Sequence, residues 1–67
     1  MFQEYDVIKL KKNIPSYKLS IGTRGTILIV YDEPNLPRAY EIEFIDDKGS
    51  TVAIITLTEE ELIMYCK

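Results

Sequence analysis

The chain has 67 residues, of which 46% are hydrophobic and 28% are charged, and its formal net charge is −3. This length predicts one domain spanning residues 1–67, because a second hydrophobic core would not fit. The acidic balance argues against a domain whose main task is to grip nucleic acid, since such domains are usually basic. The first six residues carry two acids, and nowhere do about 18 consecutive apolar residues occur. We therefore expect a cytoplasmic protein that does not enter a membrane.

The first predicted strand covers residues 5–10, where Ile8 and Leu10 fall on one face. A long ordered loop is expected over residues 11–21, because Pro15 lacks a backbone donor and the segment lacks clean alternation. A loop of this length needs apolar anchors. We expect three of its residues to tuck beneath it: Ile14, Leu19 and Ile21.

Two glycines, Gly22 and Gly25, precede the longest apolar run of the chain. They predict a turn or bulge, because glycine adopts positive φ without steric cost. The following strand, at residues 25–31, is apolar on both faces until Tyr31. Such a strand either lies in a covered barrel or presents its outer face to a partner.

The next predicted strand, at residues 39–45, shows the clearest alternation of the sequence. Its expected core residues are Tyr40, Ile42 and Phe44, and its expected solvent-facing residues are Glu41 and Glu43. A tight turn at residues 46–49, with Gly49 in the left-handed position, then leads into a strand at residues 50–57.

Thr58 and Glu61 match a capping box, which starts a helical turn. The segment 62–65 either finishes that turn or adds a short fifth strand that closes the sheet. The whole pattern predicts an all-β fold: a small five-stranded barrel with a single helical turn before the last strand.

The sequence holds few groups suited to catalysis. It contains no histidine, and its single cysteine, Cys66, is next to last in the chain. There is therefore no imidazole for acid–base work or for a conventional metal site, and no cysteine pair for a disulfide or zinc site. We expect a protein that is not an enzyme, with no catalytic residue, no metal and no cofactor.

Acidic residues concentrate in the second half, where nine acids face three bases from Asp32 onward. This asymmetry predicts an acidic protein-binding surface made of Glu41, Glu43, Asp46 and Asp47. Tyr17 and Tyr31 stand at loop ends and are candidates for the same task, since exposed aromatic side chains concentrate binding energy. Solvated strand and turn carboxylates, and tyrosines that pack on the barrel, are the simpler interpretation of both sets.

Basic residues gather in the first half, and five of them could form a phosphate-binding surface: Lys9, Lys11, Lys12, Lys18 and Arg24. Solvated strand and loop side chains explain them more simply, because the domain is acidic and no basic motif interleaved with aromatic residues occurs. Nucleic acid is therefore the alternative partner rather than the expected one.

The order of elements resembles the SH3-like barrel. Four stretches are similar to a family of short bacterial proteins known as a domain of unknown function, family 4926: Glu4-Tyr5-Asp6-Val7, Gly25-Thr26-Ile27, residues 39–44 and Thr56-Leu57. The resemblance covers nearly the whole chain and implies a stand-alone domain with an antitoxin-like, immunity-like or inhibitory role. The Gly-Thr-Ile turn is also similar to that of KOW domains, which bind RNA or protein.

The expected function is therefore a non-enzymatic protein-binding module that presents its acidic surface to a basic, nucleic-acid-acting partner. One alternative is a KOW-like domain that binds RNA or the ribosome through its basic residues. Another is a structural module that self-associates through the strand at residues 25–31, which is apolar on both faces.

Overall fold

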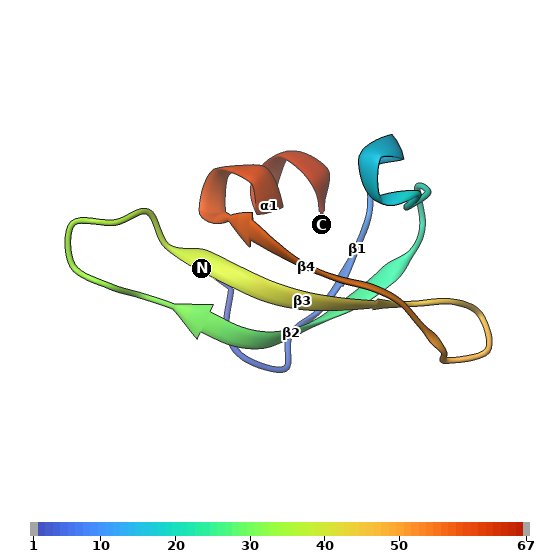
Figure 1. The fold of residues 1–67 in the computed structure, drawn as a ribbon, viewed down its shortest axis with the longest axis horizontal. Helices are drawn as coiled ribbons and strands as arrows, with labels where there is room; N and C mark the ends of the chain where they lie inside the picture. Colours follow the sequence, from blue (N-terminus) through green and yellow to red (C-terminus); the bar gives the residue numbers. More distant parts are fainter. Residues whose placement is uncertain (1, 67) are drawn as a thin grey trace.

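The computed structural model describes residues 2–66 and contains one antiparallel sheet with strand order β1-β2-β3-β4 (Figure 1). The strands are β1 Val7–Lys9, β2 Arg24–Tyr31, β3 Ala39–Ile45 and β4 Thr51–Thr58. A short 3-10 helix, η1 (Pro15–Tyr17), interrupts the connection between β1 and β2, and α1 (Glu59–Tyr65) follows β4 directly. The fold is thus mostly β, as the sequence predicts.

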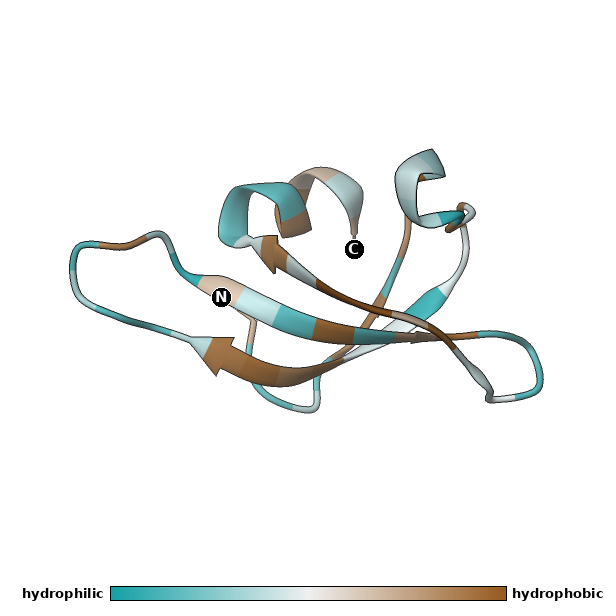
Figure 2. Cartoon of the chain, viewed as in Figure 1, coloured by the Kyte–Doolittle hydropathy of each residue, from teal (hydrophilic) through white to brown (hydrophobic). Residues whose placement is uncertain are grey.

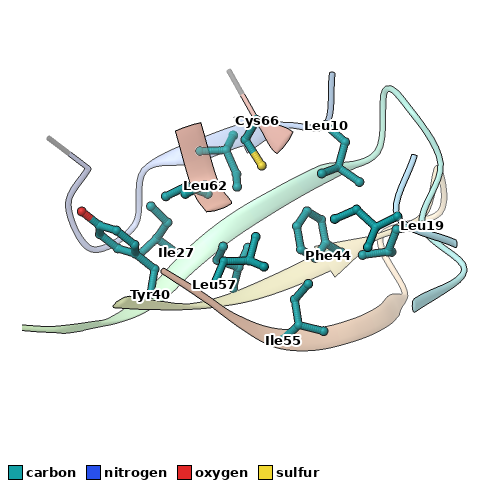
Figure 3. Close-up of a cluster of buried hydrophobic side chains, with 12 residues drawn as sticks. Leu10, Leu19, Ile27, Tyr40, Phe44, Ile55, Leu57, Leu62 and Cys66 are labelled. Carbon is teal, nitrogen blue, oxygen red and sulfur yellow. The ribbon is translucent and has the colours of Figure 1, made fainter. Parts of the chain in front are cut away.

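Strand β3 lies in the middle of the sheet and determines which side is the core. Hydrophilic and hydrophobic residues alternate over most of its length (Figure 2), and buried positions alternate with partly exposed ones throughout. Tyr40, Ile42 and Phe44 are completely buried, as predicted, and each fully buried apolar side chain of this size contributes about 1.5–3 kcal/mol. Figure 3 shows Phe44 among the buried side chains of the neighbouring strands, with Leu62 of α1 across from the sheet.

The β1–β2 connection is anchored at two of its three predicted positions. Ile14 and Leu19 are buried and pair with each other on either side of η1, whereas Ile21 is 63% exposed. The prediction for Ile21 was wrong because a polar contact holds that part of the loop instead. The Ile21 N–H donates to Oδ1 of Asn13 at 2.7 Å, which leaves the isoleucine side chain free to face solvent.

The two glycines before the central strand have different roles. Gly22 has a φ of +92° and makes the predicted turn. Gly25 lies inside β2, as the predicted strand at residues 25–31 places it, but it has no positive φ, so the prediction of a turn or bulge glycine is wrong for it. A Cβ atom at this position would lie 2.8 Å from Cγ2 of Ile42 and 2.9 Å from the ring of Phe44. Gly25 is therefore required by the close approach of β3 side chains.

The chain end differs most from the sequence prediction. The capping box is present: the Glu61 N–H donates to Oγ1 of Thr58 at 3.2 Å, and Oε1 of Glu61 accepts the Thr58 N–H at 2.9 Å. The helix that it starts is seven residues long rather than a single turn. A fifth strand is not confirmed: within residues 2–66 the chain end pairs with the sheet through one bridge, between Leu10 and Cys66.

Replacing Gly25 by alanine tests the packing role of this position. We expect Gly25→Ala to lower the free energy of unfolding by about 1–3 kcal/mol, because the added methyl group overpacks Ile42 and Phe44. Gly22→Ala is the comparison, since its Cβ meets open space and only the positive φ costs about 1 kcal/mol. Urea denaturation followed by circular dichroism measures both. A Gly25→Ala protein as stable as the wild type would contradict the packing argument.

Candidate protein-binding surface

The alternation of β3 places two predicted acidic residues side by side on the face of the sheet opposite the core. Glu41 lies between Ile29 of β2 and Thr56 of β4, and Glu43 lies between Thr26 and Ile54. We call this surface the outer face; it consists of Val7, Thr26, Ile29, Tyr31, Glu41, Glu43, Ile54 and Thr56.

The outer face also carries exposed apolar side chains around its two carboxylates. Val7 is 68% exposed, Ile54 is 54% exposed and Ile29 is 39% exposed. A register shift between Ile27 and Ile29 marks a bulge in β2, which turns Ile29 outward while Ile27 is fully buried. The doubly apolar strand of the sequence is thus buried on one face and open to solvent on the other.

A cross-strand hydrogen bond orients one of the two central carboxylates. The Thr51 hydroxyl donates to Oε2 of Glu43, whereas the Tyr31 hydroxyl lies 3.5 Å from Oε1 of Glu41, which is longer than a usual O–H···O bond. Both glutamates remain partly accessible. The result is a pair of carboxylates, one of them held by a hydrogen bond, inside an apolar surround.

The other two predicted acids lie in the turn between β3 and β4. Oδ1 of Asp46 accepts the backbone N–H groups of Lys48 and Ser50 at 2.8 and 2.9 Å, so this side chain builds the turn. Asp47 is exposed next to it. Asp46 and Asp47 therefore continue the negative charge beyond the end of the outer face.

The two candidate tyrosines are not brought together. Tyr17 belongs to η1, at the end of the sheet where β2 begins, and Tyr31 ends β2 at the opposite end (Figure 1). Of the two, Tyr31 lies on the outer face beside Glu41.

Three of the five predicted basic residues share one groove, of about 710 Å³, between the β1–β2 connection and the β3–β4 turn. Lys9, Lys18 and Arg24 line it, but Asp46 and Asp47 line the same groove. Lys11 and Lys12 are exposed and do not line this groove. The groove is therefore mixed in charge rather than uniformly basic.

A polar cluster that the sequence analysis did not identify lies at the other end of the sheet. The buried Tyr40 hydroxyl donates to Oε1 of Glu59 and accepts the Nε–H of Arg38 at 2.9 Å. Arg38 also pairs with Asp32 at 2.8 Å and donates to the Phe2 carbonyl at 3.4 Å. Burial, and then the hydrogen bond to Glu59, raise the pKa of Tyr40.

This cluster joins four parts of the chain rather than forming a reactive site. The polar groups of Arg38 and Tyr40 point at one another, and the Glu59 N–H donates to the Arg38 carbonyl at 2.8 Å. The feature that could have revealed this cluster is the register of the β3–β4 hairpin. Ala39 pairs with Thr58, so the preceding Arg38 and the following Glu59 must be neighbours.

Cys66, although next to last in the chain, is held in the fold. It is 4% exposed, pairs with Leu10 and belongs to the core (Figure 3). Burial raises the pKa of the Cys66 thiol to about 11, although Lys11 acts in the opposite direction. The thiol is therefore protonated at neutral pH and is a poor nucleophile.

Within residues 2–66, no three His, Cys, Asp or Glu side chains are placed to hold a metal ion together. Among the same residues, no helix has the length and apolar character needed to cross a lipid bilayer.

These observations define a small, mostly β domain with one C-terminal helix and a mixed acidic and apolar sheet face. The chain belongs to DUF4926, a family described as a domain of unknown function, whose model matches residues 4–64. This match confirms the family resemblance of the sequence. No curated protein and no solved structure matches the chain significantly.

The polar cluster should contribute measurably to stability. We expect Tyr40→Phe to lower the free energy of unfolding by about 1–3 kcal/mol, because it leaves Arg38 and Glu59 without their shared hydroxyl. Tyr31→Phe is the matched control, since its hydroxyl makes one long, exposed bond, and its effect should stay within about 0.5 kcal/mol. Equal urea midpoints for the two variants would show that the cluster does not stabilise the fold.

The buried thiol predicts a loss of stability in alkali. The unfolded chain releases the Cys66 proton near pH 9.0, and the folded chain releases it near pH 11. Because rising pH between these values favours the state that has released the proton, the free energy of unfolding is unaffected by this group below pH 9 and declines as the pH rises to 11. The decline amounts to at most about 2.7 kcal/mol. Cys66→Ala should flatten the stability curve between these pH values, although Tyr40 keeps a slope of the same sign. If the free energy of unfolding of Cys66→Ala declines with pH as steeply as that of the wild type, the loss of stability does not come from the Cys66 thiol.

Proposed function

We propose that this domain is a non-enzymatic protein-binding module whose outer face receives a basic partner, in an antitoxin-, immunity- or inhibitor-like role. The observation that supports it is the position of Glu41 and Glu43 at the centre of a sheet face with exposed Val7, Ile29 and Ile54 around them. The solvated face of an antiparallel sheet commonly carries polar residues, whereas this one carries three exposed apolar side chains. An apolar surround excludes water from a bound cation and strengthens its attraction to the carboxylates.

Negative charge beyond the outer face favours the same type of partner. Asp47 extends the acidic surface at one end of the sheet. Complementary charge of this kind speeds association and fixes the register of two surfaces more than it adds affinity. A nucleic-acid-acting protein, whose binding cleft is basic, fits this chemistry.

The finer fold assignment belongs to the same proposal. We propose an SH3-like barrel in which the last strand is reduced to the single bridge between Leu10 and Cys66. The Lys11 N–H, which donates to the Tyr65 carbonyl at 2.8 Å, supports this closure. Bacterial origin and a cytoplasmic location are predictions from the sequence alone.

The KOW-like alternative is supported by one arrangement, the meeting of Lys9, Lys18 and Arg24 in one groove. Filter binding of single-stranded RNA at two salt concentrations separates it from our proposal, because phosphate contacts make affinity depend on salt. We expect negligible binding at both concentrations, since Asp46 and Asp47 share the groove.

Charge reversal on the outer face tests the proposal. The domain is immobilised, proteins are captured from a lysate of the native cell, and the retained partner is identified by mass spectrometry. Glu41→Lys and Glu43→Lys should each weaken binding of that partner at least about tenfold, because a like charge then meets its basic surface.

Glu33→Lys is the matched control, since it reverses the charge of an exposed residue of the β2–β3 loop that is not part of the outer face, and it should leave binding within about twofold. If all three variants bind the partner equally, the outer face is not the binding surface.

A further inference from the structure

Within residues 2–66, strand β4 forms an edge of the sheet, and the register shows which of its backbone groups do not pair with β3. The Glu59 N–H donates to the Arg38 carbonyl, so Arg38 and Glu59 are opposite each other as a hydrogen-bonded pair. The next pair along the ladder, Ala39 and Thr58, is therefore a non-hydrogen-bonded pair. Hydrogen-bonded and non-hydrogen-bonded pairs alternate along an antiparallel ladder. The backbone N–H and C=O groups of Ile54 and Thr56 therefore point away from β3.

Beyond the register shift at its start, this edge lacks the features that usually prevent further pairing. Strand β4, Thr51–Thr58, contains no charged residue and no proline, and most of its residues are β-branched. The opposite edge is different. Strand β1 has three residues, one of them Lys9, and the chain end covers its continuation through the bridge from Leu10 to Cys66.

Two local features limit the part of β4 that can accept another strand. At the far end, the Thr58 N–H already donates to Oε1 of Glu61. At the near end, the register shifts beside Ile45, which pairs with Thr51 while Phe44 pairs with Ala53. The open segment is therefore Ala53–Leu57.

Acidic side chains lie at both ends of this open segment. The β3–β4 turn carries Asp46 and Asp47 beside Lys48, and Lys9, Lys18 and Arg24 line the groove that these two aspartates also line. The start of α1 carries Glu59, Glu60 and Glu61, and the neighbouring Arg38 is already paired with Asp32. A strand added in either direction would thus meet an acidic group at each end.

We propose that the free edge of β4 accepts an extended strand from the partner, uncharged opposite Ala53–Leu57 and flanked at both ends by Lys or Arg. The Lys or Arg flanks of this strand rest on the proposed function, which assigns a basic partner to the domain. The added strand forms backbone hydrogen bonds with Ile54 and Thr56, and its flanking cations meet the acidic ends.

A second copy of this chain fits the edge less well. Antiparallel pairing of β4 with itself would bring the turn with Asp46 and Asp47 beside Glu59 and Glu60 of the other copy. The carboxylates of the two copies would repel each other, and only the groove cations Lys9, Lys18 and Arg24 would offset that repulsion. A strand that carries its own flanking cations needs no such offset, and it is the occupant that we propose.

Amide hydrogen exchange with a synthetic probe tests the proposal. The probe is the end-blocked peptide Lys-Lys-Thr-Val-Thr-Val-Thr-Lys-Lys. In the protein alone, the amides of Ile54 and Thr56 should exchange faster than those of Ile55 and Leu57. At saturating peptide, exchange at Ile54 and Thr56 should slow at least about tenfold.

Two controls isolate the backbone pairing. The same peptide N-methylated at alternate residues keeps its charge but loses its donors, and it should give no protection. Thr56→Pro removes one outward N–H without removing a bond to β3, and it should weaken peptide binding at least about tenfold. If Thr56→Pro does not fold, the N-methylated peptide alone decides.

Three results would overturn the proposal: no protection of Ile54 and Thr56 at millimolar peptide, equal protection by the N-methylated peptide, or protection that rises with protein concentration without peptide. The last would identify self-pairing. These results are separate from the test of the outer face. If Glu41→Lys and Glu43→Lys abolish partner binding while the edge amides stay unprotected, the protein-binding function stands and strand addition does not.

Discussion

The pairing of β3 with a strand on each side is the constraint on which the rest of this structure depends. Because successive side chains of a strand point to opposite faces, one register determines both surfaces of the sheet. Tyr40, Ile42 and Phe44 fill the core, and Glu41 and Glu43 must then lie on the other face. A slip of one residue would bury both carboxylates, and none of the buried residues within 2–66 carries a charge that could neutralise them. The hydrophobic core therefore also fixes the position of the acidic site.

Two features hold this register in place. On β2, Gly25 leaves the space that the Phe44 ring occupies, so any other residue would force the side chains of Ile42 and Phe44 to shift. At the opposite end, the hydroxyl of Tyr40 lies between Arg38 and Glu59 and ties the start of β3 to the start of α1. One contact is apolar and close, and the other is polar and directional. Together they restrain β3 near both of its ends.

The elements with strong local signals could be predicted from the sequence. The strand at residues 39–45 has strict alternation, and Gly49 and the pair Thr58 and Glu61 have specific turn and cap chemistry. The length of the final helix could not be predicted, because residues 62–65 suit a helix or a strand equally well. Tertiary packing decides it: Leu62 is fully buried against the sheet, and the Lys11 N–H binds the Tyr65 carbonyl.

The candidate site was predictable in part for the same reason. Alternation alone places Glu41 and Glu43 on one face, but only the register of three strands shows Ile29 and Ile54 beside them. The polar cluster and the buried state of Cys66 depend on contacts between residues far apart in the chain. Composition and local pattern do not encode such contacts. Gly25 illustrates the limit, since its sequence context indicates a turn and its neighbours in space explain its identity.

The outer face and the free edge of β4 are connected by the geometry of antiparallel pairing. Ile54 and Thr56 present their side chains on the outer face because they pair with Glu43 and Glu41. The same non-hydrogen-bonded pairing turns their backbone groups toward the open edge. Side-chain contacts on the face and backbone contacts at the edge therefore come from the same two residues. A strand that joined β4 would extend the outer face by one strand and place its own side chains next to those of Ile54 and Thr56. A partner that combined a basic surface with such a strand would use both in one interface, and the backbone bonds would set the register in which its cations meet Glu41 and Glu43.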